Sequence, residues 1–248
     1  MTKPAIEISE PVRLSKQLAA NVPCSRRDAE QYIENGWVKV DGVLVEEPYF
    51  KVRVDQLIEL HPGAKLGKLE AATFLLHKPA DIVIGDDADA ASGWIDIANR
   101  WPDDEYAMRL LRRHTTRLVS PLPLEPAASG LWVLSQDWQV LRKLDEDADS
   151  IEQEFNVDVA GEIEPNGLAM LNHGLQLEGW RLPERKVSWQ SETRLRFAIR
   201  AVRPGMLQAM CAAVGLQVSA LKRIRVGRVS MAKMQPGQWR LLATREKF

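Results

Sequence analysis

Beyond residue 72, strand-like segments outnumber helical ones and do not alternate regularly with them, which constrains the fold more than any other feature. The expected strands span residues 73–77, 131–134, 154–159, 186–189, 194–199, 218–224 and 229–231, and the expected helices span residues 138–144, 168–171 and 206–214. A doubly wound parallel sheet needs a helix after nearly every strand. The order of elements therefore predicts an α+β domain built on a mixed, mostly antiparallel sheet.

Residues 11–60 predict a smaller unit in which two helices precede a small sheet. Ser25 and Asp28 form a capping box at the start of the second helix, and Asn35-Gly36 is a C-cap signal at its end. Apolar residues then alternate with polar ones on both sides of Asp41-Gly42, a pair typical of type I′ hairpin turns. We therefore expect a helix-pair-plus-sheet domain over residues 1–62, a linker over residues 63–72 and the larger domain over residues 73–248.

Composition excludes several classes of protein. The chain of 248 residues has two cysteines, Cys24 and Cys211, too few for a disulfide framework or a zinc knuckle. No apolar run reaches the roughly 18–20 residues of a membrane span, and residues 1–10 lack the basic and apolar regions of a signal peptide. The 4 histidines have no metal-ligand spacing. We expect a soluble, cytoplasmic protein with no membrane partner and no bound metal.

The net charge of −1 hides a strong asymmetry along the chain. Residues 181–248 carry 15 basic and 3 acidic side chains, whereas residues 66–180 carry 9 basic and 21 acidic ones. A basic region of this kind suits a polyanionic partner such as a nucleic acid. Mutual neutralisation of the two regions in the folded protein is an equally good explanation of the composition.

Two groups of basic residues are candidate RNA-binding sites. The first surrounds the turn between the two N-terminal helices and consists of Arg13, Lys16, Arg26, Arg27 and Lys39. The second consists of Lys222, Arg223, Arg225 and Arg228, and alternation along a strand places Arg223 and Arg225 on one exposed face. Both groups suit contacts with RNA phosphates. The alternative is that these side chains are ordinary surface charges that contact only solvent.

The N-terminal unit resembles a known RNA-binding domain, the one named after ribosomal protein S four. The resemblance lies in Arg13-Leu14-Ser15-Lys16, Cys24-Ser25-Arg26-Arg27-Asp28-Ala29-Glu30, Gly36-Trp37-Val38 and Val40-Asp41-Gly42. It covers nearly the whole unit and implies that the helix pair binds structured RNA.

Most of the remaining chain resembles the catalytic domain of ribosomal-RNA pseudouridine synthases of the RsuA/RluF type, which carry the same N-terminal domain. The similar segments are Leu76-His77-Lys78-Pro79, residues 128–137, Leu171-Asn172-His173-Gly174, residues 221–227 and Pro236-Gly237-Gln238-Trp239-Arg240. The resemblance implies that the chain isomerises a uridine in ribosomal RNA to pseudouridine. It also implies a buried carboxylate and no cofactor or metal.

The segments that match the family's active site differ from its pattern. The family's Gly-Arg-Leu-Asp loop corresponds to Leu122-Pro123-Leu124-Glu125, so the resemblance implies that Glu125 is the catalytic carboxylate. The aromatic residue that stacks on the target base, a tyrosine in the family, corresponds to Phe155. The family's arginine-rich helix start corresponds to residues 204–210, which contain no arginine. Each of these two roles has a structural alternative. Glu125 is instead an exposed loop residue, and Phe155 is instead a packing residue of the core.

Three hypotheses of function follow, of which the third is an enzyme that acts on a different RNA with a rebuilt site. The first is a pseudouridine synthase that uses Glu125 and Phe155 and acts as a monomer on structured RNA, most simply ribosomal RNA. The second is a catalytically inactive RNA-binding protein that keeps the same scaffold for ribosome assembly or RNA chaperoning. The loss of the arginines favours the second, and the retained carboxylate and aromatic ring favour the first.

Overall fold

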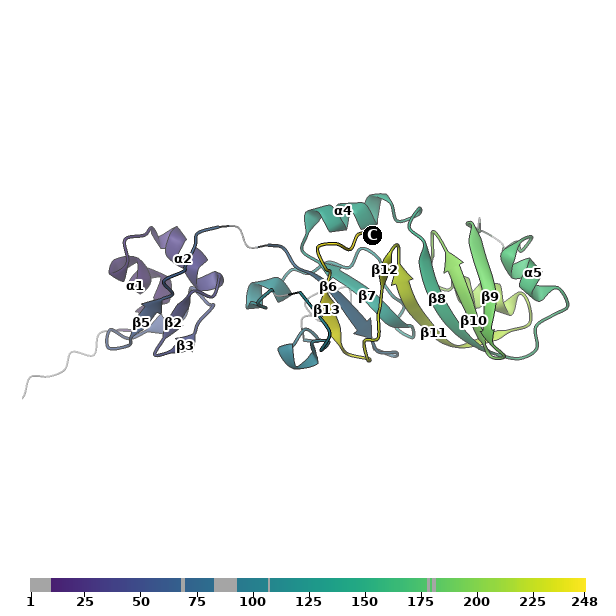
Figure 1. Ribbon diagram of the computed structural model, residues 1–248, viewed down its shortest axis with the longest axis horizontal. Helices are drawn as coiled ribbons and strands as arrows, with labels where there is room; N and C mark the ends of the chain where they lie inside the picture. The colour runs from purple at the N-terminus through teal and green to yellow at the C-terminus, as the bar shows by residue number, and fades with distance from the viewer. Residues whose placement is uncertain (1–9, 68–69, 83–92, 107, 178, 180–181) are drawn as a thin grey trace, which may run out of the picture. The chain divides into compact units, whose positions relative to one another are not determined.

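The computed structural model describes residues 10–67, 70–82, 93–106, 108–177, 179 and 182–248 (Figure 1). The chain divides into two compact units. The first consists of residues 1–70 together with residues 109–115, and the second consists of residues 71–108 and 116–248. Among the described residues, no helix is long and apolar enough to cross a membrane.

The first unit packs two helices, α1 and α2, against short strands. The elements are β1 (Val12–Arg13), α1 (Leu14–Asn21), α2 (Arg26–Glu34), β2 (Val38–Val40), β3 (Val43–Leu44), β4 (Lys51–Val52) and β5 (Ile58–Leu60). The predicted capping box is confirmed, because the Ser25 hydroxyl accepts the Asp28 N–H at 3.1 Å and the Asp28 carboxylate accepts the Ser25 N–H at 3.0 Å. Leu14, Leu18 and Ile33 are fully buried in its core.

A segment far along the sequence completes the first unit. Residues 109–115, including the 3₁₀ helix η2 (Arg112–Thr115), pack against residues around Gly36 and Glu46. Arg113 pairs with Glu34 at 3.3 Å, and the Arg112 backbone N–H donates to the Glu46 carboxylate at 2.6 Å. The first unit therefore includes a segment that lies outside residues 1–62.

The second unit is built on a sheet whose strand order is β13-β6-β7-β11-β8-β10-β9, with β12 paired to β11. The strands are β6 (Thr73–Lys78), β7 (Ser129–Ser135), β8 (Gln153–Ala160), β9 (Arg185–Ser191), β10 (Arg194–Ile199), β11 (Gln217–Val226), β12 (Val229–Ser230) and β13 (Trp239–Leu241). Only β11 and β7 pair in parallel in the described sheet. The predicted mixed, mostly antiparallel α+β architecture is confirmed.

Helices cover separate parts of this sheet, and Figure 1 labels two of them, at the top and at the right of the second unit. The helix α4 (Trp138–Glu146) packs against β7, α5 (Gly167–Asn172) against β9, and α6 (Met206–Ala212) against β11. One hydrophobic cluster lies beneath α5 and α6 and includes Phe155, Phe197 and Met210, and a second joins β7 to α4. The three helices predicted from the sequence are thereby confirmed, with small differences at their ends.

Candidate active site

The loop that contains Glu125 leads from Pro121 into β7, and Glu125 lies against the start of α6. It contains three prolines between residues 121 and 126, which restrict its backbone but leave its carbonyl groups without the partners that a helix or strand would supply. Two buried cationic side chains satisfy several of these carbonyl groups.

Arg223 holds the part of the loop that precedes Glu125. Its side chain is 1% exposed and donates to the carbonyl oxygens of Leu122 at 2.9 Å and Pro123 at 3.4 Å. It also donates to the Leu131 carbonyl at 2.8 Å and to Gln153 Oε1 at 3.0 Å. Burial lowers the pKa of its guanidinium to about 9, so the group is still charged at neutral pH.

Lys78 holds the part of the loop that follows Glu125. Its ammonium group donates to the Pro126 carbonyl at 2.8 Å and to the Ala128 carbonyl at 2.7 Å, and the residue is 2% exposed. Burial lowers the pKa of this amine, and the nearby Asp81 carboxylate opposes the shift. In the sequence, Lys78 is only one residue of a segment that resembles the family, and its contact with residues 126–128 cannot be read from spacing.

Glu125 is half-buried, and both of its carboxylate oxygens are held by residues at the start of α6. Oε1 accepts the Gly205 backbone N–H at 2.9 Å, and Oε2 accepts the Gln208 side-chain amide at 2.8 Å. A carboxylate has about four lone-pair sites, so positions remain for a further hydrogen-bond donor. The segment that has lost the family's arginines therefore still contacts this carboxylate, through neutral donors. The other atom of the Gln208 amide, Oε1, is buried without a partner in the described part of the chain.

Phe155 lies in the core of the second unit. The residue is 2% exposed, pairs across the sheet with Phe197 and Arg223, and belongs to the cluster beneath α5 and α6. This is the core position that the sequence left open as the alternative. A ring that is buried to this extent gives no geometric support for stacking on a base.

The prediction that Arg223 lies on an exposed basic strip is wrong. The register between β11 and β8 shifts between Arg223 and Arg225, so that these residues pair with the neighbouring residues Phe155 and Glu154. Such a bulge breaks the alternation of side chains along a strand, and it places Arg223 in the interior.

The remaining residues of the C-terminal group are partly paired. Arg225 donates to the carboxylates of Glu154 at 2.7 Å and Glu152 at 2.5 Å, which compensates its charge. Lys222 is half-buried, and its pKa is lowered by burial and by the nearby Arg194. Arg228 is exposed. A phosphate contact by Lys222 or Arg228 stays a prediction.

The N-terminal group is solvent-accessible. Arg13, Lys16, Arg26, Arg27 and Lys39 are all exposed in the first unit. Arg26 lies 3.7 Å from the Glu30 carboxylate on the same helix, a surface pair that contributes little to stability. These side chains are available for phosphate contacts, which stay a prediction.

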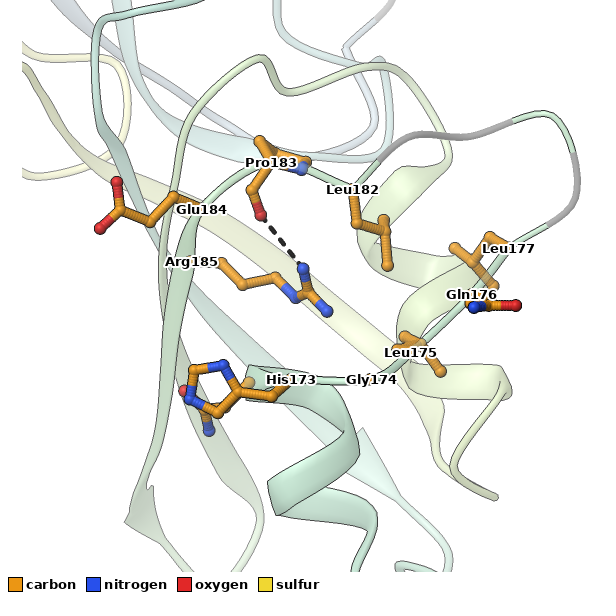
Figure 2. Close-up of a pocket in the computed structure, with 10 residues that line it drawn as sticks. His173, Gly174, Leu175, Gln176, Leu177, Leu182, Pro183, Glu184 and Arg185 are labelled. Carbon is orange, nitrogen blue, oxygen red and sulfur yellow. Dashed lines mark hydrogen bonds between the residues drawn. The ribbon is translucent and has the colours of Figure 1, made fainter.

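A separate pocket of about 640 Å³ lies between the end of α5 and the start of β9 (Figure 2). In Figure 2 the Arg185 guanidinium points toward the space between residues 173–177 and residues 182–183, and it donates to the Pro183 carbonyl at 3.1 Å. It also donates to the Leu171 carbonyl at 2.6 Å. Among the described residues, none of the predicted site residues lines this pocket, and no group of His, Cys, Asp or Glu side chains has the geometry of a metal site.

Comparison with known proteins agrees with the resemblance seen in the sequence. The S4 domain model matches residues 12–58. The chain is 26% identical over 240 residues to a protein of Aquifex aeolicus named as an RNA pseudouridine synthase, which covers 95% of this chain and 94% of that protein. It is 25% identical over 241 residues to the dual-specificity RNA pseudouridine synthase RluF of Escherichia coli, covering 95% of this chain and 77% of RluF.

Another relative is longer than this chain. A chloroplast protein of Arabidopsis thaliana, SVR1, whose name describes a ribosomal large subunit pseudouridine synthase, is 28% identical over 230 residues. The match covers 88% of this chain and 55% of that protein, so the chain spans about half the length of this relative.

A solved structure supports the fold. The crystal structure of a pseudouridylate synthase matches with a TM-score of 0.57 and 23% identity, over 94% of this chain and 96% of that chain. An S4 domain followed by a domain with the pseudouridine synthase fold identifies the chain as a homologue of the RsuA/RluF-type pseudouridine synthases.

Proposed function

We propose that this chain isomerises uridine to pseudouridine in ribosomal RNA, with Glu125 as the essential carboxylate. The observation that carries the proposal is the placement of Glu125, whose two oxygens are bound by Gly205 and Gln208 while Arg223 and Lys78 hold the loop on either side of it. The relatives named as pseudouridine synthases support the same reaction.

The reaction breaks the glycosidic bond of uridine, rotates the base and joins it to the ribose through carbon. A carboxylate that acts at the ribose or the base must be placed closely, since a displacement of about 1 Å can lower the rate roughly a hundredfold. Here the carboxylate itself is bound by a backbone N–H and a side-chain amide, whereas Arg223 acts on the carbonyl groups of the loop before it. Hydrogen bonds to an ionised acceptor are stronger than neutral ones, which suits this role.

The test is to map pseudouridines in ribosomal RNA by chemical labelling and primer extension. Wild-type cells are compared with a deletion strain, and with that strain complemented by the wild-type chain, by Glu125→Gln or by the matched control Glu162→Gln. Glu162 is an exposed glutamate in the same unit. We expect one pseudouridine to disappear on deletion and to return with the wild-type chain and the control, but not with Glu125→Gln.

Two results would contradict the proposal. Pseudouridines that all persist in the deletion strain would refute the reaction on ribosomal RNA and favour the inactive RNA-binding alternative. Full restoration by Glu125→Gln would refute the role of the carboxylate.

Gln208→Ala separates the positioning of Glu125 from RNA binding. It removes one of the two donors to the carboxylate, so we expect a lower kcat and an unchanged affinity for RNA. We also expect a monomeric, cytoplasmic protein, and size-exclusion chromatography tests the first of these.

A further inference from the structure

The first unit has an exposed aromatic ring next to a pair of short strands that carries two cationic side chains. Tyr49 is 69% exposed, although tyrosine usually buries most of its ring. The Arg13 guanidinium carbon lies 5.4 Å from the centroid of the Tyr49 ring, a cation–π contact that covers one face. The exposure of the residue leaves the rest of the ring open to solvent.

The backbone that carries Tyr49 is fixed by the start of α1. The first two N–H groups of that helix, from Leu14 and Ser15, donate to the carbonyls of Phe50 at 2.7 Å and Pro48 at 3.3 Å. The N–H groups at the start of a helix have no partners within the helix. These two hydrogen bonds therefore satisfy the helix donors and, at the same time, the carbonyl groups of Phe50 and Pro48. Tyr49 is therefore an exposed ring on an ordered backbone, and little conformational entropy is lost when a ligand stacks on it.

The cations beside the ring are free to meet an anion. Arg13 and Lys51 are directly opposite each other in the β1–β4 pair, and both are exposed, whereas Val12 and Val52 point toward the core. Neither cation pairs with a carboxylate among the described residues. The nearby carboxylates of Glu46 and Glu47 are instead bound by the backbone and side chain of Arg112.

We propose that Tyr49, Arg13 and Lys51 form a binding site for a single-stranded segment of RNA. An unpaired base stacks on the open face of Tyr49, while Arg13 and Lys51 contact the flanking phosphates. Stacking of this kind requires a base that is splayed out of a helix, because the bases of a duplex are covered by their neighbours. The site thus gives the first unit a preference for unpaired nucleotides next to the structured RNA.

The test measures the affinity of the full chain for a short single-stranded RNA and for a duplex of the same sequence by fluorescence anisotropy. A 2-aminopurine in the single strand reports stacking. We expect Tyr49→Ala to weaken single-strand binding by about 5- to 150-fold, from the usual strength of base–aromatic stacking. It should also abolish quenching of 2-aminopurine and leave duplex binding unchanged.

Three control variants separate stacking from charge and from loss of folding. Tyr49→Phe keeps the ring and is expected to bind like the wild type. Leu57→Ala removes another exposed apolar side chain of the same unit and is expected to change nothing. Lys51→Gln should lower the slope of log affinity against log salt by about 0.7 for one phosphate contact on a single strand, whereas Tyr49→Ala should leave that slope unchanged.

Equal loss of single-strand and duplex binding on Tyr49→Ala would refute the stacking site, as would unchanged single-strand binding by a folded Tyr49→Ala protein. In the second case the exposed ring would have to contact another class of partner. The assay involves no turnover, so its outcome is independent of whether Glu125 acts as a catalytic carboxylate.

Discussion

The replacement of Arg223 by methionine tests how the loop before Glu125 is held. The guanidinium donates to three backbone carbonyls and to the Gln153 side chain at distances from 2.8 to 3.4 Å. Methionine is unbranched and apolar and has no donor, so these acceptors would lose their partner in the interior. A buried unsatisfied polar group costs about 1–3 kcal/mol.

The magnitude follows from these contacts. Gln153 can turn its amide, and removal of a buried charge recovers some desolvation energy, which together offset part of the loss. We therefore expect Arg223→Met to lower the free energy of unfolding by about 4 kcal/mol, within the range measured for breaking buried charged contacts. For a unit of this size, the melting temperature would fall by roughly 8–16 °C.

Thermal unfolding followed by tryptophan fluorescence measures the effect, with Arg228→Met as the matched control. Arg228 is exposed between β11 and β12, and its replacement should change stability by less than about 0.5 kcal/mol. A melting temperature of Arg223→Met equal to that of the control would refute the argument that Arg223 holds residues 122–123. Below the melting temperature, Arg223→Met should also lower the rate of isomerisation, since the loop loses its anchor.

Three other predictions test separate parts of the structure. Gly130 has a φ of +106°, and a Cβ there would lie 2.1 Å from the Arg223 carbonyl oxygen, so Gly130→Ala should destabilise the second unit by about 3 kcal/mol or more in urea unfolding. Ser25→Ala removes the capping box and should cost the first unit about 1 kcal/mol, measured in the same way, whereas Lys39→Ala should cost much less. Burial lowers the pKa of His114, so its neutral form is favoured in the fold and the first unit should lose stability as the pH falls below about 6.5. His114→Leu should reduce this acid sensitivity in melting experiments at about pH 7.5 and pH 5.5, and an unchanged pH dependence would show that another group is responsible.

Local patterns in the sequence predicted the elements well because their causes are local. The capping box at Ser25 and Asp28 requires two side chains separated by three residues, and the alternation in β8 requires only a period of two. The same reasoning failed at Arg223, because the bulge between β11 and β8 depends on how two distant strands align. The sequence does not predict the short strands β1 and β4, since two residues carry too little periodicity.

The sequence by itself determined that this chain has two kinds of unit, a helix pair with a small sheet and a larger antiparallel α+β domain, and it identified the family they resemble. Hydrophobic periodicity, turn residues and capping pairs act over a few residues, so they can be read without coordinates. Only the tertiary structure decided that residues 109–115 complete the first unit, that Phe155 lies in the core, and that Lys78 and Arg223 hold the loop of Glu125. Each of these features consists of contacts between residues that are far apart in the sequence. Such contacts depend on the packing of the whole sheet.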